Sequence, residues 1–167
     1  RDMMNLNLLF ELDPAQHPKL SAEIQQLTDW DRSYDIDNQT APLFICTIQQ
    51  LIQNLRAEGR YQWRGQITKA DAHRAISGAK AFLLEHYGST QVRLGDFLRH
   101  RRGTVDLPLA GGPDVLAAMH STRQPDGTYK GMAGESYIEL VRFGPEGIEI
   151  ETIHAYGSSE KPDSPHY

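Results

Sequence analysis

Residues 128–167, TYKGMAGESYIELVRFGPEGIEIETIHAYGSSEKPDSPHY, decide the fold, because no other part of the chain has comparably strong strand chemistry. Two runs rich in Ile, Val, Tyr and Phe, at 136–143 and 148–156, flank the turn sequence GPEG at 144–147. In such a turn proline sets φ and the glycines supply positive φ values. The stretch therefore predicts a β-hairpin.

The predicted hairpin lacks partners within its own chain. A two-stranded hairpin is at best marginally stable in water, and helices that cover it would still leave two exposed edges. We therefore expect its sheet to contain more strands than this chain provides. The alternation of apolar and polar residues in 148–153 also shifts phase at Thr152. This shift predicts a β-bulge or a change from half-exposed to two-sided burial.

Length and composition indicate one globular domain of ordinary type. The chain has 167 residues, a net charge of -5 and 39% hydrophobic residues. This balance does not favour nucleic acid or an anionic membrane as a partner. No apolar run approaches the ~20 residues of a membrane span, and the N-terminus lacks the residue order of a secretory signal. The chain begins with Arg1 rather than Met, and we expect this to reflect excision from a longer precursor.

Upstream of the hairpin, apolar residues recur at helical spacing, so the predicted fold class is α+β. The expected organisation is a mostly helical region at 1–127, followed by the hairpin and a loop at 128–167. The predicted helices cover 2–12, 21–27, 42–58, 68–87, 92–100 and 113–119.

Several of these helices carry recognisable end signals. Ser21 and Thr68 are predicted N-caps, and Asp71 is favourably placed in the first turn that follows Thr68. Pro42 suits a first helical position, and Gly88 suits a helix stop. These signals make the helices at 42–58 and 68–87 the best defined of the set.

Motifs that hold metals or cofactors are incomplete. The acidic segment from Asp29 offers oxygen ligands at alternate positions, as a calcium loop does. However, Tyr34 replaces the glycine and Thr40 replaces the bidentate glutamate that an EF-hand requires. The seven histidines are scattered without zinc-ligand spacing, and no glycine-rich phosphate loop is present. We expect no cofactor and no metal site.

Candidate nucleophiles are equally incomplete. Ser-x-x-Lys occurs at Ser77 and at Ser158, but the first lies in a predicted mid-helix and the second in a proline-rich loop. Ser136 lacks the second glycine of the Gly-x-Ser-x-Gly elbow. Cys46, the only cysteine, lies in an apolar helical run, as buried thiols do. The basic cluster at 99–102 suits a helix C-terminus better than nucleic acid, because no aromatic residues interleave it.

A series of short motifs follows in order along the chain. They are Arg101-Arg-Gly, Asp106-Leu-Pro-Leu, Gly111-Gly-Pro-Asp-Val-Leu, Ala133-Gly-Glu-Ser-Tyr-Ile, Val141-Arg-Phe-Gly, Ala155-Tyr-Gly-Ser-Ser and Pro162-Asp-Ser-Pro-His-Tyr167. Together they closely resemble the C-terminal part of the β chain in the penicillin acylase family. The similar branch contains acyl-homoserine lactone and cephalosporin (glutaryl) acylases. Two upstream segments, Leu27-Thr-Asp-Trp-Asp31 and Ala41-Pro-Leu-Phe44, resemble the same family more weakly.

The resemblance implies an N-terminal nucleophile hydrolase with an αββα core. Such a protein is made as a precursor that cuts itself into α and β chains, and it works in the periplasm. The first residue of the β chain, a serine, attacks the amide carbonyl and its own α-amine serves as the base. This chain begins with Arg1 instead, so the nucleophile, the nearby histidine and the oxyanion asparagine would lie upstream of it.

By this resemblance, the chain supplies no catalytic residue of its own. Glu135 takes the acidic position of the family's Gly-Asp/Glu-Ser-Tyr motif, where a carboxylate could orient the histidine beside the nucleophile. Ser136 and His166 are the other candidates for supporting positions. In the alternative, Glu135 and Ser136 satisfy backbone groups where the strand begins, and His166 fixes the following loop.

Two functions stay open at this point. In the first, the chain is the C-terminal β-chain segment of an acylase that hydrolyses amide bonds, with acyl-homoserine lactones or β-lactam side chains as substrate types. Its partners would then be the α chain and the N-terminal part of the β chain, and it would be inactive alone. In the second, it is a free-standing, non-catalytic helical and hairpin module that binds a protein through an exposed sheet edge. Neither function involves nucleic acid or a membrane.

Overall fold

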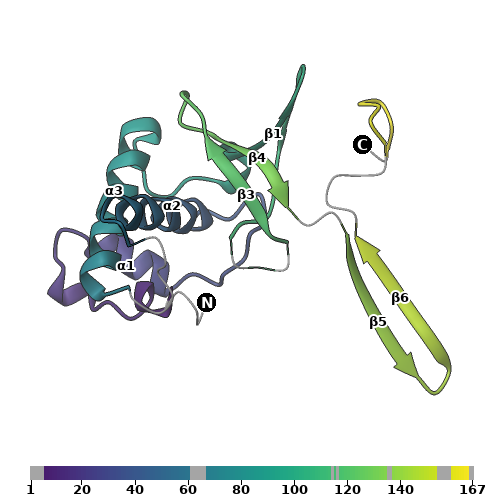
Figure 1. Ribbon diagram of the computed structural model, residues 1–167, viewed down its shortest axis with the longest axis horizontal. Helices are drawn as coiled ribbons and strands as arrows, with labels where there is room; N and C mark the ends of the chain where they lie inside the picture. The colour runs from purple at the N-terminus through teal and green to yellow at the C-terminus, as the bar shows by residue number, and fades with distance from the viewer. Residues whose placement is uncertain are drawn as a thin grey trace.

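A computed structural model of the chain describes residues 6–60, 67–113, 115, 117–134, 137–153 and 159–165. Helices occupy the first part of the chain and strands the second, so the fold class is α+β, as predicted (Figure 1). The helical segments are η1 (Leu6–Leu9), η2 (Pro14–Gln16), α1 (Ser21–Thr28), α2 (Ala41–Ala57), α3 (Lys69–Tyr87) and α4 (Leu94–Phe97). The strands are β1 (Leu98–Arg102), β2 (Val105–Pro108), β3 (Met119–Arg123), β4 (Tyr129–Gly134), β5 (Ile138–Gly144) and β6 (Gly147–Ile153).

The two long helices, α2 and α3, pack against each other and form most of the core. The predicted proline lies in the first turn of α2, whose apolar stripe is buried, with Leu43, Phe44 and Leu51 fully enclosed. A capping box between Thr68 and Asp71 begins α3, and Gly88, with a φ of 69°, ends it. The end signals in the sequence therefore placed both helices correctly.

Within the described residues, no helix is long and apolar enough to cross a membrane.

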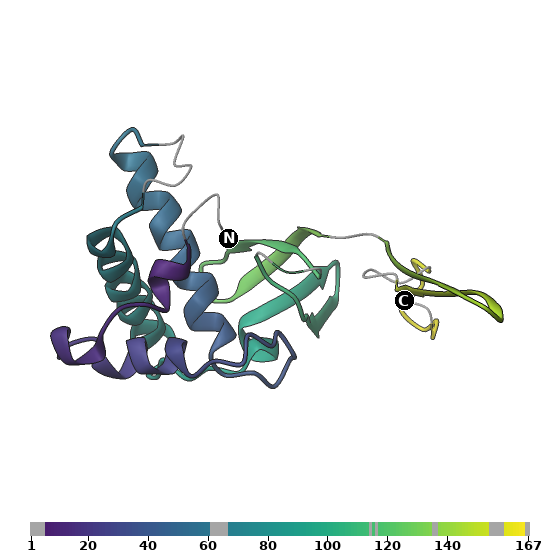
Figure 2. The same cartoon turned by 90° about the horizontal axis from the view of Figure 1, so that it is seen from below.

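A four-stranded sheet lies beside the helices, with strand order β2-β1-β4-β3. β1 pairs antiparallel with β2 and parallel with β4, and β4 pairs antiparallel with β3. The helices lie on one side of this sheet, and the β5–β6 hairpin extends away on the other side (Figures 1 and 2). Stacked rings of Phe97 and Tyr129, 4.4 Å apart between centroids, join the end of α4 to the sheet.

The predicted hairpin is confirmed. β5 and β6 pair antiparallel around the turn at 144–147, in a regular register from Ile138 opposite Ile153 to Gly144 opposite Gly147. Two details differ from the expectation. Gly147 has a positive φ of 135°, but Gly144 does not. The β-bulge predicted at Thr152 is also wrong, because the register does not shift within this pair.

The helix predicted at 92–100 is confirmed only in part, as α4. The helix expected at 92–100 ends at Phe97, and the basic cluster continues as β1, with Leu98 already extended at φ -100° and ψ 120°. Arg99 and Arg101 then pair across the strands with Asp106, at 2.7 and 3.1 Å, and Arg101 also reaches Asp126 at 2.8 Å. The basic residues are therefore explained by cross-strand ion pairs rather than by a helix dipole.

The helix expected at 113–119 is absent from the described residues of that range. Gly111 has a φ of 96°, Gly112 forms an isolated bridge with Ala118, and Met119 begins β3. The helix expected at 2–12 is a short 3-10 helix in its described part, and Leu20 rather than Ser21 occupies the N-cap of α1. The division of the chain at 127/128 into two domains stays a prediction, and the turn between β3 and β4 lies at this position.

Candidate functional site

The three residues singled out in the sequence, Glu135, Ser136 and His166, lie outside the described residues. Glu135 and Ser136 follow directly on Gly134, the last residue of β4, and precede β5. Their proposed support of a catalytic histidine therefore stays a prediction. The candidate site that the structure does describe lies close to this point, along the edge strand β3.

A groove of about 360 Å³ runs between α2 and β3. Its apolar surface comes from isoleucines on one face of α2 and from Met119 on β3, and its polar surface from amide and cationic groups. The lining residues are Ile45, Ile48, Gln49, Ile52, Gln53, Arg56, Pro113, Met119, His120, Ser121, Thr122 and Arg123. The groove exists because α2 presents residues at helical spacing to a strand that is the edge of its sheet.

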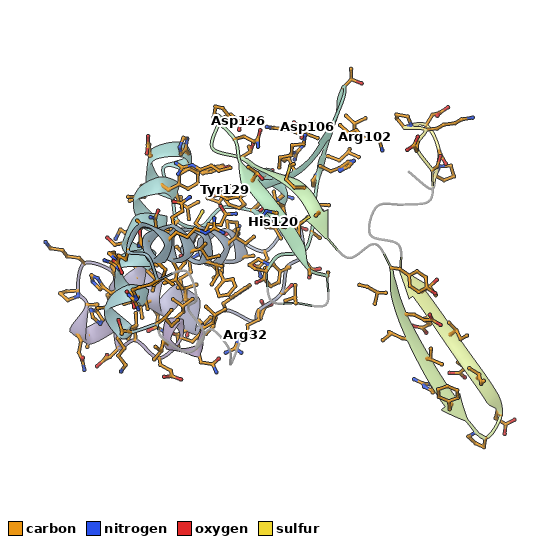
Figure 3. The ribbon with its side chains drawn as sticks, in the orientation of Figure 1. Arg32, Arg102, Asp106, His120, Asp126 and Tyr129 are labelled. Atoms are coloured by element: carbon orange, nitrogen blue, oxygen red, sulfur yellow. The ribbon has the colours of Figure 1, made fainter. Side chains whose placement is uncertain are left out.

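One hydrogen bond fixes the width of this groove. The Nε2 atom of Gln49 donates to the backbone oxygen of Ser121 over 3.1 Å. This oxygen lies at a β-bulge, because the register of β3 against β4 shifts between His120 and Ser121. Ser121 is buried, whereas His120, which is labelled in Figure 3, is exposed on the same strand. The bulge therefore changes which side chains β3 turns toward the helix.

Arg123 supplies a positive charge at one end of the groove. Its guanidinium lies 3.7 Å from the centroid of the Phe82 ring, and its Nη2 atom lies 3.5 Å from Nε2 of His86. A cation above an aromatic face is attracted by the electron density of the ring. Among the described contacts of Arg123 no carboxylate occurs, so this end of the groove suits an anionic group.

A second depression, also of about 360 Å³, lies at the start of β3 and the end of β4. The two share Pro113, Met119 and His120, and the second extends to Ala133 and Gly134 at the end of β4. Gly134 is the sequence neighbour of Glu135. The second depression thus reaches the residue before the predicted supporting carboxylate.

Cys46 lies on α2 and is not a reactive nucleophile. The thiol is buried and lies 3.9 Å from the hydroxyl oxygen of Tyr129, which follows from the packing of α2 against β4. Burial raises the pKa of Cys46 to about 12, which keeps the thiol protonated at neutral pH. Burial also raises the pKa of Tyr87 to about 12 and that of Tyr129 above its usual range.

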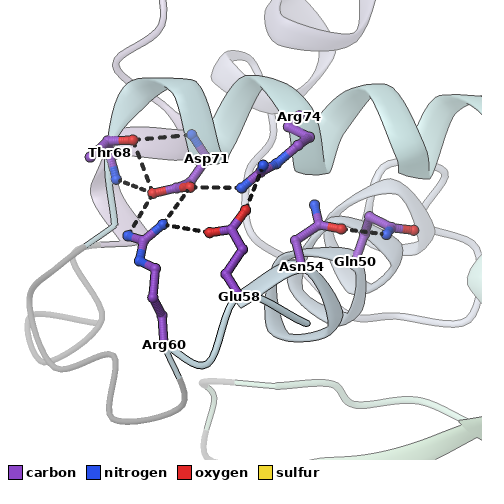
Figure 4. Close-up of polar contacts among 7 residues, drawn as sticks. All are labelled: Gln50, Asn54, Glu58, Arg60, Thr68, Asp71 and Arg74. Carbon is purple, nitrogen blue, oxygen red and sulfur yellow. Dashed lines mark hydrogen bonds and ion pairs between the residues drawn. The ribbon is translucent and has the colours of Figure 1, made fainter. Parts of the chain in front are cut away.

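A second polar cluster connects the end of α2 to the start of α3 (Figure 4). Asp71 accepts hydrogen bonds from Arg60, Thr68 and Arg74, and Arg74 also pairs with Glu58 at 2.6 Å. The hydrogen bonds from Arg60 lower the pKa of Asp71 to about 2. All of these groups are satisfied by one another, so the cluster holds two helix ends together and does not form a substrate site.

The described residues can bind better than they can catalyse. The groove offers an apolar floor, the guanidinium of Arg123 and the side chains of His120, Ser121 and Thr122. Among the described residues, no hydrogen bond joins either hydroxyl to the His120 imidazole. Among the described residues, no cluster of three or more His, Cys, Asp or Glu side chains could hold a metal ion. The arrangement is suited to an apolar chain or segment with an anionic group near Arg123.

Sequence reasoning did not identify Gln49 or Arg123 as neighbours in one site. They lie on α2 and β3, and the strand itself was not predicted. The available signal was the polar Gln49-Gln50 pair inside the apolar run of α2, which marks a helix face that meets a polar partner. Only the sheet order identifies that partner as β3.

Comparison with known proteins identifies related sequences. A family model described as Penicillin amidase matches residues 1–167. The chain is 31% identical over 81 residues to the acyl-homoserine lactone acylase PvdQ of Pseudomonas fluorescens strain Pf-5, covering 47% of this chain and 10% of the relative. It is 24% identical over 166 residues to the acylase of the same name from strain Pf0-1, covering 87% of this chain. The chain spans about a fifth, 21%, of the length of that second relative.

Proposed function

Because the chain belongs to the penicillin amidase family, we propose that it is a β-chain segment of an acylase, and that the complete acylase hydrolyses amide bonds to a carboxylic acid and an amine. Acyl-homoserine lactones or β-lactam side chains are the proposed substrate types, and the names of the two relatives favour the first. The segment is the C-terminal part of the β chain and is inactive in isolation. The complete acylase works in the periplasm.

The observation that carries this proposal is the extent of the matches. The family model covers the whole chain, yet the chain aligns with only 21% of a relative named for the same chemistry. The exposed hairpin supports the same view. Phe143 and Ile148 are 78% and 62% exposed, as expected for strands that other parts of a larger protein would cover.

In the complete enzyme, the nucleophile, its α-amine base and the oxyanion donors come from outside this chain. The helical layer and the groove along β3 then form one wall of the enzyme. Glu135 is a positioning residue in this proposal, because its carboxylate would orient the histidine near the nucleophile.

The test compares the complete processed protein with the isolated 167-residue chain on chromogenic acyl amides. We expect turnover by the complete protein and none by the isolated chain. Replacement of the serine at the β-chain N-terminus by alanine is the control, and it should abolish turnover without loss of folding. The contrary result is turnover by the isolated chain that Glu135→Gln leaves intact and Cys46→Ala abolishes. It would overturn the proposal that this chain contributes no catalytic nucleophile.

The test of Glu135 must measure a quantity that would not change if Glu135 only stabilised the fold. In the complete enzyme, Glu135→Gln should lower kcat more than it changes KM, and it should shift the acidic limb of the pH–rate profile. Glu139→Gln, in the neighbouring strand β5, is a matched control that should leave both unchanged. Equal effects of the two substitutions would contradict the positioning role.

The second candidate function is a free-standing binding module. The observation in its favour is the same hairpin, whose unpaired edges could accept a strand of a partner. The encoding gene separates the two candidates. Several hundred upstream codons with a Gly-Ser processing junction support the acylase, and a start codon adjacent to Arg1 supports the module. Cell fractionation with antibodies to this chain tests the periplasmic location.

A further inference from the structure

Four exposed apolar side chains near the hairpin turn lie on one face. In an antiparallel pair, residues directly opposite each other project to the same side, and successive residues alternate. The register places Phe143 opposite Ile148 and Val141 opposite Ile150. These four side chains form the apolar tip face, and they are 78%, 62%, 43% and 57% exposed.

The opposite face of the tip carries three charged residues and one exposed apolar residue, Leu140. Arg142 lies opposite Glu149, and the two form an ion pair of 3.2 Å. Glu151 projects to the same side, opposite Leu140. The side chains of Arg142 and Glu149 are 80% and 71% exposed, so in this chain both faces of the tip are open to solvent (Figure 3).

The two faces differ in what their burial would cost. Covering the apolar tip face removes hydrocarbon from water, which is favourable. Covering the opposite face with an apolar layer would desolvate the Arg142–Glu149 pair and the carboxylate of Glu151, which has no ion-pair partner among the described residues. This desolvation is unfavourable. At Thr152, opposite Glu139, the apolar tip face ends. The change in apolar and polar alternation at Thr152 therefore marks the boundary of the apolar tip face. The pairing of β5 with β6 stays regular across this boundary.

We propose that the apolar tip face packs against an apolar layer of the acylase polypeptide outside these 167 residues, and that the charged face stays in contact with water. This inference rests on the proposed function, since the occupant is the rest of the enzyme. About four-fifths of the length of the Pf0-1 relative lies outside the aligned region, which provides ample chain for such a layer. Burial of both faces of the strand is one of the two meanings predicted for the alternation shift at Thr152. In this proposal only the apolar tip face is buried.

The experiment measures which face is covered in the complete processed protein. Phe143→Cys and Arg142→Cys place thiols on adjacent residues of β5 that project to opposite faces. Each variant is treated with a maleimide under native conditions, and labelling at that position is followed by peptide mass spectrometry. We expect Cys at 142 to label rapidly, and Cys at 143 to label about tenfold or more slowly, because labelling there requires local opening.

A second measurement avoids substitution of the anchor residue. Hydroxyl-radical footprinting of the unmodified complete protein should protect Phe143 and Ile148, and heat denaturation should remove the protection. In the maleimide experiment, rapid labelling at both 142 and 143, or slow labelling at both, would overturn the proposal. Protection that disappears on dilution would also overturn it, since the occupant would then be a second copy.

Amide hydrolysis is measured on the same preparation, so that the two proposals fail separately. Active enzyme with an unprotected Phe143 contradicts the docking of the hairpin and leaves the acylase function standing. Protected Phe143 without hydrolysis in an intact, processed protein contradicts the acylase function. This result would still support burial of the apolar tip face by another part of the same polypeptide.

Discussion

Arg60 and Asp71 form a two-pronged ion pair in which the Nη1 and Nη2 atoms of the guanidinium each lie 3.0 Å from one carboxylate oxygen. Arg60 follows the end of α2, and Asp71 lies in the first turn of α3. The same carboxylate accepts the backbone N–H of Thr68 in the capping box. One side chain therefore begins a helix and joins it to the preceding one (Figure 4).

Replacing Asp71 by Asn should lower the free energy of unfolding of the chain by about 2 kcal/mol at neutral pH. The pKa of Asp71 is about 2, below its ordinary value of 3.8, and each unit corresponds to about 1.4 kcal/mol. Urea unfolding followed by circular dichroism measures the change. Asp96→Asn is the control, because its pairing with Arg93 at 3.6 Å is exposed and contributes ~0–1 kcal/mol.

The same substitution predicts a pH dependence with a definite sign. Because the folded-state pKa of Asp71 is depressed, its stabilisation is complete above about pH 4 and is lost as the pH falls towards 2. The difference in stability between the chain and its Asp71→Asn variant should therefore shrink over this window. A difference that stays constant from pH 5 to about pH 2 would contradict the role of the carboxylate charge.

Cys46 should resist thiol reagents in the folded chain. Its pKa of about 12 and its burial against Tyr129 leave little thiolate at neutral pH and no access for the reagent. We expect Ellman's reagent to modify this single thiol only after the chain unfolds. Full reaction before any change in circular dichroism would show that α2 and β4 are not packed as described.

Arg123 and Phe82 should be energetically coupled through their direct contact. A double-mutant cycle with Arg123→Ala and Phe82→Leu should give a coupling of about 0.5–1 kcal/mol, the usual range for a partly exposed cation above a ring. Lys130→Ala, on the adjacent strand β4, is a matched control for loss of a positive charge. A coupling energy of zero within error would contradict the contact between the Arg123 guanidinium and the Phe82 ring.

Gly112→Ala should destabilise the chain strongly, because a Cβ atom there would lie 2.0 Å from Cε1 of Tyr34. Gly103→Ala, where nothing lies within 4 Å, should cost only the ~1 kcal/mol of a positive φ. Replacing Tyr34 by Leu should reduce the loss of stability caused by Gly112→Ala. Thermal unfolding measures this loss in both backgrounds. An unchanged penalty in the Tyr34→Leu background would show that the ring is not the obstacle.

The sequence was informative where neighbours in the chain decide the structure. The caps at Thr68 and Gly88 and the turn at 144–147 act over a few residues, and the helices and hairpin they predicted are present. β1 was missed because its residues, LRHRR, show no apolar alternation and pair instead with Asp106. The supporting positions Glu135, Ser136 and His166 came from resemblance alone, and they stay predictions.

By itself, the sequence determined the α+β class, the ends of α2 and α3, the hairpin and the resemblance to its family. Only the tertiary structure decided that α2 lies along β3, that Gln49 meets Ser121, and that the hairpin tip is uncovered on both faces. The physical reason is the range of the interactions. Caps and turns form between residues a few positions apart, whereas strand order and the exposure of a face depend on contacts between distant segments.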